Sequence, residues 1–169
     1  MSLEQRLRDK TCLENYLVSV IDDTVKYSEN YVQKAEKNGK IDEQYSEAKR
    51  VLRLYAECSS RGVASNEFTA EFISQMILER RGRMLQKICC ALVTGMAGLG
   101  LAYLGAHIPD AIPGITVNIS GWVIALVNLG LLYYIPKRDV REIGIVSTAI
   151  AQNREILGKA LVRSYKGQK

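Results

Sequence analysis

The stretch of sequence that decides the fold runs from Ile88 to Pro136 and reads ICCALVTGMAGLGLAYLGAHIPDAIPGITVNISGWVIALVNLGLLYYIP. Asp110 carries the only formal charge in these residues, although charged residues make up 24% of the 169-residue chain. Charge is therefore concentrated in the residues on either side of this stretch. This division excludes a disordered chain and disfavours an ordinary globular enzyme built around one core.

The uncharged stretch predicts a hairpin of two membrane-spanning helices, at about residues 88–108 and 115–135, within a segment covering 85–136. Each span has about the 20 apolar residues that cross the hydrocarbon core of a bilayer. The loop at residues 109–114 contains two prolines, an acid and a glycine, which favour a tight turn. The alternative is a soluble helical bundle that buries the hairpin and inserts it on a trigger. The rest of the chain could barely cover two wholly apolar helices, so the membrane interpretation is favoured.

Basic residues flank both spans, whereas the loop between the spans contains no Lys or Arg. The positive-inside rule then predicts an integral membrane protein with both termini in the cytoplasm. The net charge of +5 is concentrated after the second span, and it suits an anionic lipid surface better than nucleic acid. The flanking basic residues are Arg80, Arg81, Arg83, Lys87, Lys137, Arg138 and Arg141.

Small residues gather on one face of the first span when its residues are placed at 100° intervals around a helix. Such a face lets another helix approach closely, and the second span is the nearest partner. The face comprises Thr94 and Gly105 together with five candidate helix-packing residues: Ala91, Gly95, Gly98, Ala102 and Ala106.

One narrow face of the second span is small and polar, and it consists of Asn118, Gly121, Ala125 and Asn128. An amide in hydrocarbon is costly unless it is paired, so Asn128 should face protein or water rather than lipid. Two interpretations remain open. The amides form hydrogen bonds between helices, within the hairpin or between subunits, or they line a pore.

Apolar residues at intervals of three and four predict helices on both sides of the hairpin. Region 1–84 should contain one helix from Leu3 to about Lys37, a second from Asp42 to Cys58, and a loop at 59–65. A third helix, with Asn66 as N-cap and a bend near Gly82, should continue into the first span. Pro136 marks an exit or kink, after which region 137–169 should form one amphipathic, basic helix.

No catalytic, metal or cofactor site is predicted from the composition. His107 is the single histidine, and Cys12, Cys58, Cys89 and Cys90 lack the spacing of zinc ligands. The cysteines suit reduced thiols. Cys89 and Cys90, at the membrane boundary, are candidates for lipidation in a eukaryotic setting, or they are simply small apolar residues.

The expected fold is therefore an all-α membrane protein, in which a cytoplasmic helical bundle is continuous with a two-span hairpin and a C-terminal amphipathic helix. The expected function is non-enzymatic. The protein would act as a scaffold or adaptor anchored in the lipid bilayer, and it would associate with copies of itself. A cytoplasmic protein is a further candidate partner. The alternative function is an oligomeric pore lined by the face of Asn118 and Asn128. Several subunits would be needed, because one hairpin cannot enclose a channel.

Overall fold

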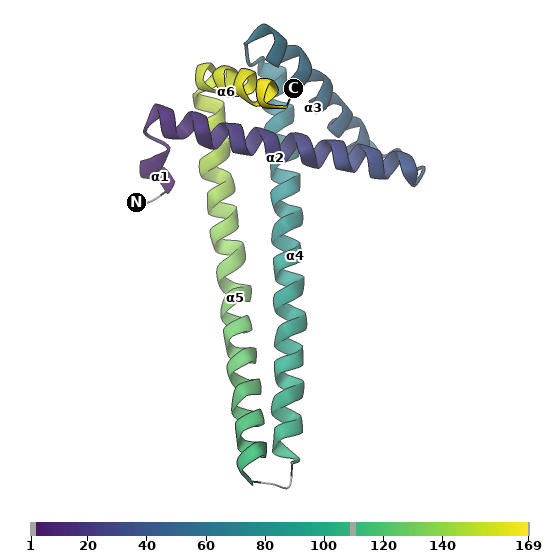
Figure 1. Cartoon of the computed structure of the whole chain (residues 1–169), viewed down its shortest axis with the longest axis vertical. Helices are drawn as coiled ribbons and strands as arrows, with labels where there is room; N and C mark the ends of the chain where they lie inside the picture. The colour runs from purple at the N-terminus through teal and green to yellow at the C-terminus, as the bar shows by residue number, and fades with distance from the viewer. Residues whose placement is uncertain (1–2, 109–110, 169) are drawn as a thin grey trace. The chain divides into compact units, whose positions relative to one another are not determined.

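The computed structural model describes residues 3–108 and 111–168, and about 90% of it is helical. In the part of the chain that is described there are no strands, so the prediction of an all-α protein is confirmed. The helices are α1 (Leu3–Arg6), α2 (Lys10–Lys37), α3 (Glu43–Arg61), α4 (Asn66–Ala106), α5 (Ala111–Gln152) and α6 (Arg154–Gly167) (Figure 1).

The chain forms two compact units. The bundle unit contains the N-terminal residues to Glu79 and the residues from Ile143 onwards, and the hairpin unit contains Arg80–Glu142. Residues 80–84 and 137–142, which the sequence analysis placed outside the hairpin, therefore belong to the same unit as the two apolar stretches. α4 and α5 each contribute residues to both units.

The bundle unit is built around a core of apolar side chains from α2, α3 and α6, the first turns of α4 and the last turns of α5. These helices form because their apolar residues recur every three or four positions, which gives each one an apolar stripe to bury. The largest fully buried apolar side chains are Phe68, Phe72, Leu17, Ile21, Met76, Ile150, Leu157, Leu161, Val25, Val51 and Val146.

The N-terminal helix is broken where the sequence predicted a single helix from Leu3 to Lys37. Asp9 caps α2, and its carboxylate accepts hydrogen bonds from the backbone N–H of Thr11 (2.8 Å) and of Cys12 (3.4 Å). A side chain that satisfies these free donors begins a new helix at the next residue. The apolar pattern continues across the break, which is why periodicity alone did not find it.

The turn between α2 and α3 follows the predicted Lys37-Asn-Gly-Lys40 signal, with Gly39 at a φ of 63°. Asp42 caps α3 by accepting a hydrogen bond from the backbone N–H of Tyr45 at 2.7 Å. The Tyr31 hydroxyl donates to the same carboxylate at 2.8 Å. These two donors, the backbone amide first, hold the pKa of Asp42 below its usual value.

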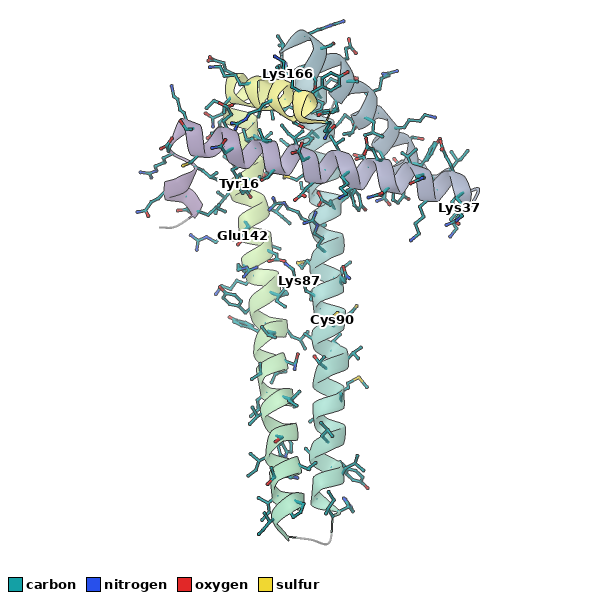
Figure 2. The ribbon with its side chains drawn as sticks, viewed as in Figure 1. Tyr16, Lys37, Lys87, Cys90, Glu142 and Lys166 are labelled. Atoms are coloured by element: carbon teal, nitrogen blue, oxygen red, sulfur yellow. The ribbon has the colours of Figure 1, made fainter. Side chains whose placement is uncertain are left out.

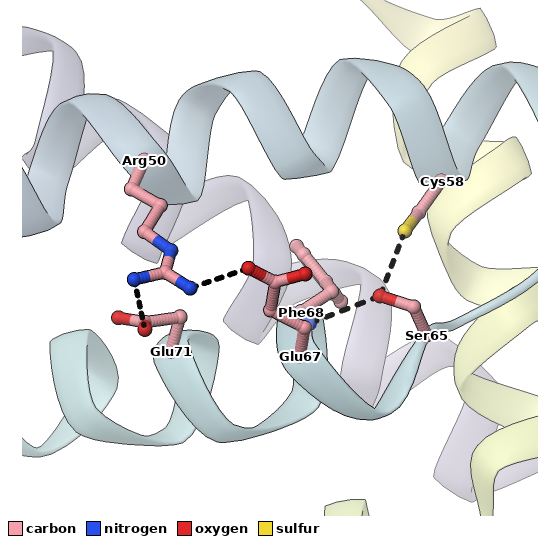
Figure 3. A network of polar contacts seen from close by, with 6 residues as sticks. All are labelled: Arg50, Cys58, Ser65, Glu67, Phe68 and Glu71. Atoms are coloured by element: carbon pink, nitrogen blue, oxygen red, sulfur yellow. Dashed lines mark hydrogen bonds and ion pairs between the residues drawn. The ribbon is translucent and has the colours of Figure 1, made fainter.

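The connection from α3 to α4 is shorter than predicted, because α3 continues to Arg61 and ends at Gly62, which has a φ of 72°. Ser65, and not Asn66, caps α4: its hydroxyl accepts a hydrogen bond from the backbone N–H of Phe68 at 3.0 Å. Cys58 in α3 donates to the same hydroxyl oxygen at 3.5 Å (Figure 3).

A salt-bridge cluster ties α3 to the first turns of α4. The Arg50 guanidinium pairs with Glu67, and it also lies 3.4 Å from a carboxylate oxygen of Glu71 (Figure 3). The hydrogen bond to Glu67 raises the pKa of Arg50. Because all three side chains are accessible to solvent, these ion pairs contribute little to the stability of the fold.

The two long helices continue through the positions where the sequence suggested a bend, a kink or an exit. α4 continues through Gly82, and α5 continues through Pro136 as far as Gln152. Proline removes one backbone donor, and the other hydrogen bonds of a long helix can keep it continuous around that gap.

The break in the C-terminal helix lies instead at Asn153, so the single helix expected over 137–169 is wrong. Asn153 has non-helical backbone angles (φ −119°, ψ 57°). Its side-chain amide donates to the carbonyl oxygen of Ala149 at 3.0 Å, a local bond that competes with continuation of the helix. α6 begins at the next residue.

Candidate functional site: an apolar hairpin with a polar seam and a basic collar

The hairpin unit has two helices that are long and apolar enough to cross a membrane, judged by length and composition. Their large apolar side chains point outward. Met96 is 72% exposed, Val93 66%, Leu129 65% and Leu126 62%. A unit with this surface is apolar on the outside, which is the reverse of the bundle unit.

Small residues form the seam between α4 and α5. A Cβ atom added to Gly121 would lie 2.3 Å from the backbone nitrogen of Ala102, and one added to Gly105 would lie 2.3 Å from that of Asn118. Such distances leave no room for a side chain, so the two backbones touch. Of the predicted helix-packing residues, Ala91, Gly98 and Ala102 are buried and Gly95 is half-buried against Asn128, whereas Ala106 is exposed.

The two asparagines of α5 both bond across this seam. The Asn118 amide donates to the carbonyl oxygen of Ala102 at 2.7 Å. The Thr94 hydroxyl donates to the Asn128 side-chain oxygen at 2.6 Å, and the Asn128 amide donates to the Ile124 carbonyl oxygen at 2.8 Å. The sequence placed these asparagines on one face with Gly121 and Ala125. It could not show that this face is turned toward α4, because that depends on how the two helices pair.

A third polar contact closes the seam at its charged end. The Lys87 ammonium nitrogen lies 2.8 Å from an Asp139 carboxylate oxygen. Figure 2 labels Lys87 on α4. Asp139 is only 8% exposed, although it carries a charge. The sequence analysis did not identify this pair. The sequence did contain a sign of it. Asp139 lies on the same face of α5 as Asn118 and Asn128, because successive steps of three or four residues lead from one to the next.

The basic residues that flank the two apolar stretches in the sequence are here called the basic collar: Arg80, Arg81, Arg83, Lys87, Lys137, Arg138 and Arg141. Lys137 lies over the ring of Tyr133 at 5.8 Å from its centroid, and Arg138 lies over the ring of Tyr134 at 5.9 Å. Arg138 is also 3.5 Å from a carboxylate oxygen of Glu142. Each of these tyrosine rings is thus exposed next to a cation.

The cysteines beside the collar are exposed free thiols in α4. Cys89 and Cys90 come two and three residues after Lys87, and neither is in a disulfide. Cys58 is buried and Cys12 exposed, both also free. The proposed lipidation of Cys89 and Cys90 remains a hypothesis that their exposure permits.

At the opposite end of the hairpin, the connection between the two helices is shorter than the predicted loop at residues 109–114. α5 begins at Ala111, so Pro113 falls in its first turn, a position that tolerates proline. The loop prediction at Pro109 and Asp110 lies outside the described residues. The His107 ring nitrogen Nδ1 lies 2.8 Å from the Tyr103 carbonyl oxygen, and its ring lies against that of Tyr103.

The bundle unit contains a buried hydroxyl network that joins α2, α3 and α6. The Ser164 hydroxyl donates to the Asp22 carboxylate and shares a 2.8 Å hydrogen bond with the Tyr55 hydroxyl. Burial is the main cause that raises the pKa of Tyr55, so this phenol stays neutral and acts as a hydrogen-bonding tie.

Across the hairpin unit, polarity is arranged in three zones: apolar outer faces, a seam of small and amide side chains, and cations at one end. Within residues 3–108 and 111–168, no group of three His, Cys, Asp or Glu side chains could hold a metal ion. No protein-family model matches the chain, and neither a curated protein nor a solved structure matches it.

Proposed function

We propose that this is an integral membrane protein in which the hairpin unit anchors the bundle unit at a membrane surface. The observation that carries the proposal is the inverted polarity of the hairpin unit. Its outer side chains are large and apolar, whereas Thr94, Asn118 and Asn128 make their hydrogen bonds toward the seam. In water this surface would be a large exposed apolar patch, which soluble proteins rarely have. In the hydrocarbon core of a bilayer, an apolar outer surface is what a spanning hairpin needs.

The proposed orientation has both termini, and with them the bundle unit, in the cytoplasm. The basic collar supports this orientation, because Lys and Arg near the ends of spans are retained on the cytoplasmic side. Residues 107–114 at the other end contain no Lys or Arg. Tyr133 and Tyr134 beside the collar suit the interface between headgroups and hydrocarbon.

The proposed activity is that of a scaffold or adaptor without catalysis. The bundle unit has its own apolar core and can present a folded surface to a second copy of the chain or to a cytoplasmic protein. The hydrogen bonds of the Thr94, Asn118 and Asn128 side chains are made within the hairpin, which suits an anchor. A pore lined by Asn118 and Asn128 would require these side chains to leave their bonds to α4 and face water in an assembly of several subunits.

The experiment that tests the anchor and its orientation is cysteine labelling in cells that express the full chain. Cys12, Cys58, Cys89 and Cys90 are replaced by Ala, and one new cysteine is introduced by Ile41→Cys or His107→Cys, both exposed positions. An impermeant maleimide should label His107→Cys in intact cells, and Ile41→Cys only after permeabilisation.

A matched wash of the same membranes at alkaline pH should leave both variants in the membrane fraction. Release of the protein by this wash, or labelling of Ile41→Cys in intact cells with protection of His107→Cys, would overturn the proposal. Release would favour a soluble bundle that inserts its hairpin only on a trigger.

A further inference from the structure

A groove lies in the bundle unit beside the turn between α2 and α3. Its volume is about 420 Å³, within the range of about 300–1,000 Å³ that small-molecule sites occupy. It is here called the tyrosine groove, and its lining includes Tyr27, Asn30, Tyr31, Lys34, Asn38 and Lys40. We propose that the tyrosine groove binds a small molecule with a planar aromatic ring and an anionic group, a phosphate or a carboxylate. This ligand site goes beyond the proposed function, because it does not require the hairpin to lie in a bilayer.

Two tyrosine rings on one face of α2 form an aromatic wall of the groove. Tyr27 and Tyr31 are about one helical turn apart, with ring centroids separated by 6.3 Å and ring planes 28° from parallel. Both side chains are half-buried, so part of each ring is open to the groove that they line. The face of a tyrosine ring binds another planar aromatic group by stacking, whatever the substituents on that group.

The hydroxyls of both tyrosines are held by residues at the start of α3. The Tyr31 hydroxyl donates to the Asp42 carboxylate at 2.8 Å, and the Gln44 side-chain amide donates to the Tyr27 hydroxyl at 3.4 Å. The hydrogen bond to Asp42 raises the pKa of Tyr31, so this phenol stays uncharged beside an anionic ligand. Because the rings are already fixed, less side-chain freedom is lost when a ligand binds.

Two lysines supply positive charge to the same groove. Lys34 and Lys40 both line it, and within the described part of the chain neither ammonium group forms an ion pair. Asp42 is the one acid among the described residues of the lining. Its two carboxylate oxygens already accept hydrogen bonds, one from the Tyr45 backbone N–H and the other from the Tyr31 hydroxyl. The lining therefore has a net positive charge, and an anionic group is its complement.

Two exposed amides add hydrogen-bonding groups to the lining. Asn30 and Asn38 can each donate and accept, and a few polar groups beside an aromatic wall are typical of small-molecule sites. The neighbouring acid Glu36 bonds instead to α3. Its carboxylate accepts a hydrogen bond from the Tyr45 hydroxyl at 2.9 Å and lies 4.0 Å from the Lys49 ammonium nitrogen. The groove thus combines an aromatic wall, two cations and two amides.

The test measures the binding of two probes to the full chain in mild detergent by isothermal titration calorimetry. Adenosine monophosphate carries a phosphate, and indole-3-acetate carries a carboxylate. Each probe has an uncharged analogue, adenosine or indole-3-acetamide, and an analogue without the ring, ribose 5-phosphate or acetate. Heats from titration into protein-free micelles are subtracted, so that partition into detergent is not counted as binding.

At least one anionic probe should bind, and its uncharged and ringless analogues should bind at least about tenfold more weakly, because each analogue lacks one of the two interactions. Binding of adenosine monophosphate alone would assign a phosphate ligand to the groove, and binding of indole-3-acetate alone would assign a carboxylate ligand. The affinity should fall as salt is raised to about 0.5 M, because the Debye length shortens.

The charge variant is Lys34→Gln/Lys40→Gln. Its matched control is Lys26→Gln/Lys37→Gln, which removes the same charge from two exposed lysines of α2 that do not line the groove. Figure 2 labels Lys37 at the end of α2. The charge variant should bind the anionic probe at least about tenfold more weakly, and the control should change the affinity by less than about twofold.

The ring variant is Tyr27→Leu, which leaves the hydrogen bond from Tyr31 to Asp42 in place. Loss of one stacking ring should weaken binding by at least about fivefold. Thermal unfolding followed by circular dichroism checks that each variant is folded, and the exposed lysine variants test the groove without changing the core.

The outcomes separate this ligand site from the proposed function. The ligand site would be overturned if neither anionic probe bound, if the uncharged analogues bound equally well, or if the charge variant and its control lost affinity equally. A chain that binds the probe but is released from membranes by the alkaline wash would keep the ligand site and lose the anchor. A chain that stays in the membrane and binds neither probe would keep the anchor and lose the ligand site.

Discussion

Gln75 is the residue with the least satisfied polar side chain in the bundle core. It is fully buried in α4, and neither its side-chain oxygen nor its nitrogen has a hydrogen-bond partner. Two other buried polar residues of the bundle, Thr24 and Ser28, do have hydrogen-bond partners. Their hydroxyls donate to backbone carbonyl oxygens one turn earlier in α2, at 2.8 and 2.9 Å. An unsatisfied buried amide costs about 1–3 kcal/mol per group, so this position weakens the bundle.

We expect Gln75→Met, which keeps the length of the side chain, to raise the free energy of unfolding of the bundle by about 1–2 kcal/mol. The measurement is chemical denaturation in mild detergent, followed by circular dichroism. Gln33→Met, at an exposed position on α2, is the control and should change stability by less than about 0.5 kcal/mol. A destabilised Gln75→Met protein would mean that the amide has a bound partner, such as an ordered water.

At the scale of the element, the hairpin depends on two helices that approach until their backbones touch. Gly121 and Gly130 lie on the same helix, but only Gly121 is in the seam. A Cβ at Gly121 would lie 2.3–2.7 Å from backbone atoms of α4, whereas a Cβ at Gly130 would meet nothing within 4 Å. The same substitution therefore has opposite consequences at the two positions.

We expect Gly121→Ala to destabilise the hairpin by about 2 kcal/mol, because neither backbone can move aside without separating the helices. Gly130→Ala should be neutral or slightly stabilising, since alanine is the better helix former. Titration of the detergent-solubilised protein with dodecyl sulfate, followed by circular dichroism, measures both. Equal stability of the two variants would show that α4 and α5 do not pack through Gly121.

At the scale of the whole molecule, the question is whether the hairpins anchor a scaffold or enclose a pore. In a scaffold, Asn128 serves the hairpin alone, through its bonds to Thr94 and to the Ile124 carbonyl oxygen. The Thr94 hydroxyl keeps a second acceptor, the Cys90 carbonyl oxygen at 2.8 Å, when Asn128 is removed. Loss of the interhelical bond should then cost only about 0.6 kcal/mol.

We expect the purified protein in mild detergent to form a discrete self-associated species whose mass is unchanged by Asn118→Leu or Asn128→Leu. Reconstituted vesicles should show no ion conductance. The detergent-corrected mass and single-channel recording test both points. A ring of four or more copies that conducts ions, and that stops conducting in the two Leu variants, would establish the pore instead. A strict monomer would rule out self-association.

The apolar stretches and the helical class of the chain could be predicted from the sequence, and so could part of the seam, although Ala106 is exposed. Each depends on properties that recur along a single segment: the length of an uncharged run, a step of three or four residues, a row of small side chains. Ala91, Gly98, Ala102 and Gly121 were identified in this way, and all four are buried between α4 and α5.

Helix boundaries and contacts between distant residues were decided only by the tertiary structure. Asp9 and Ser65 begin helices, and Pro136 does not end one, because local hydrogen bonds and the neighbouring helix outweigh residue preferences. The Lys87–Asp139 pair joins residues 52 positions apart. Such a pair contributes nothing to either helix alone, so no pattern within one segment reveals it. It exists because packing the small-residue seam sets the register of the two helices and brings an acid and a base to the same level.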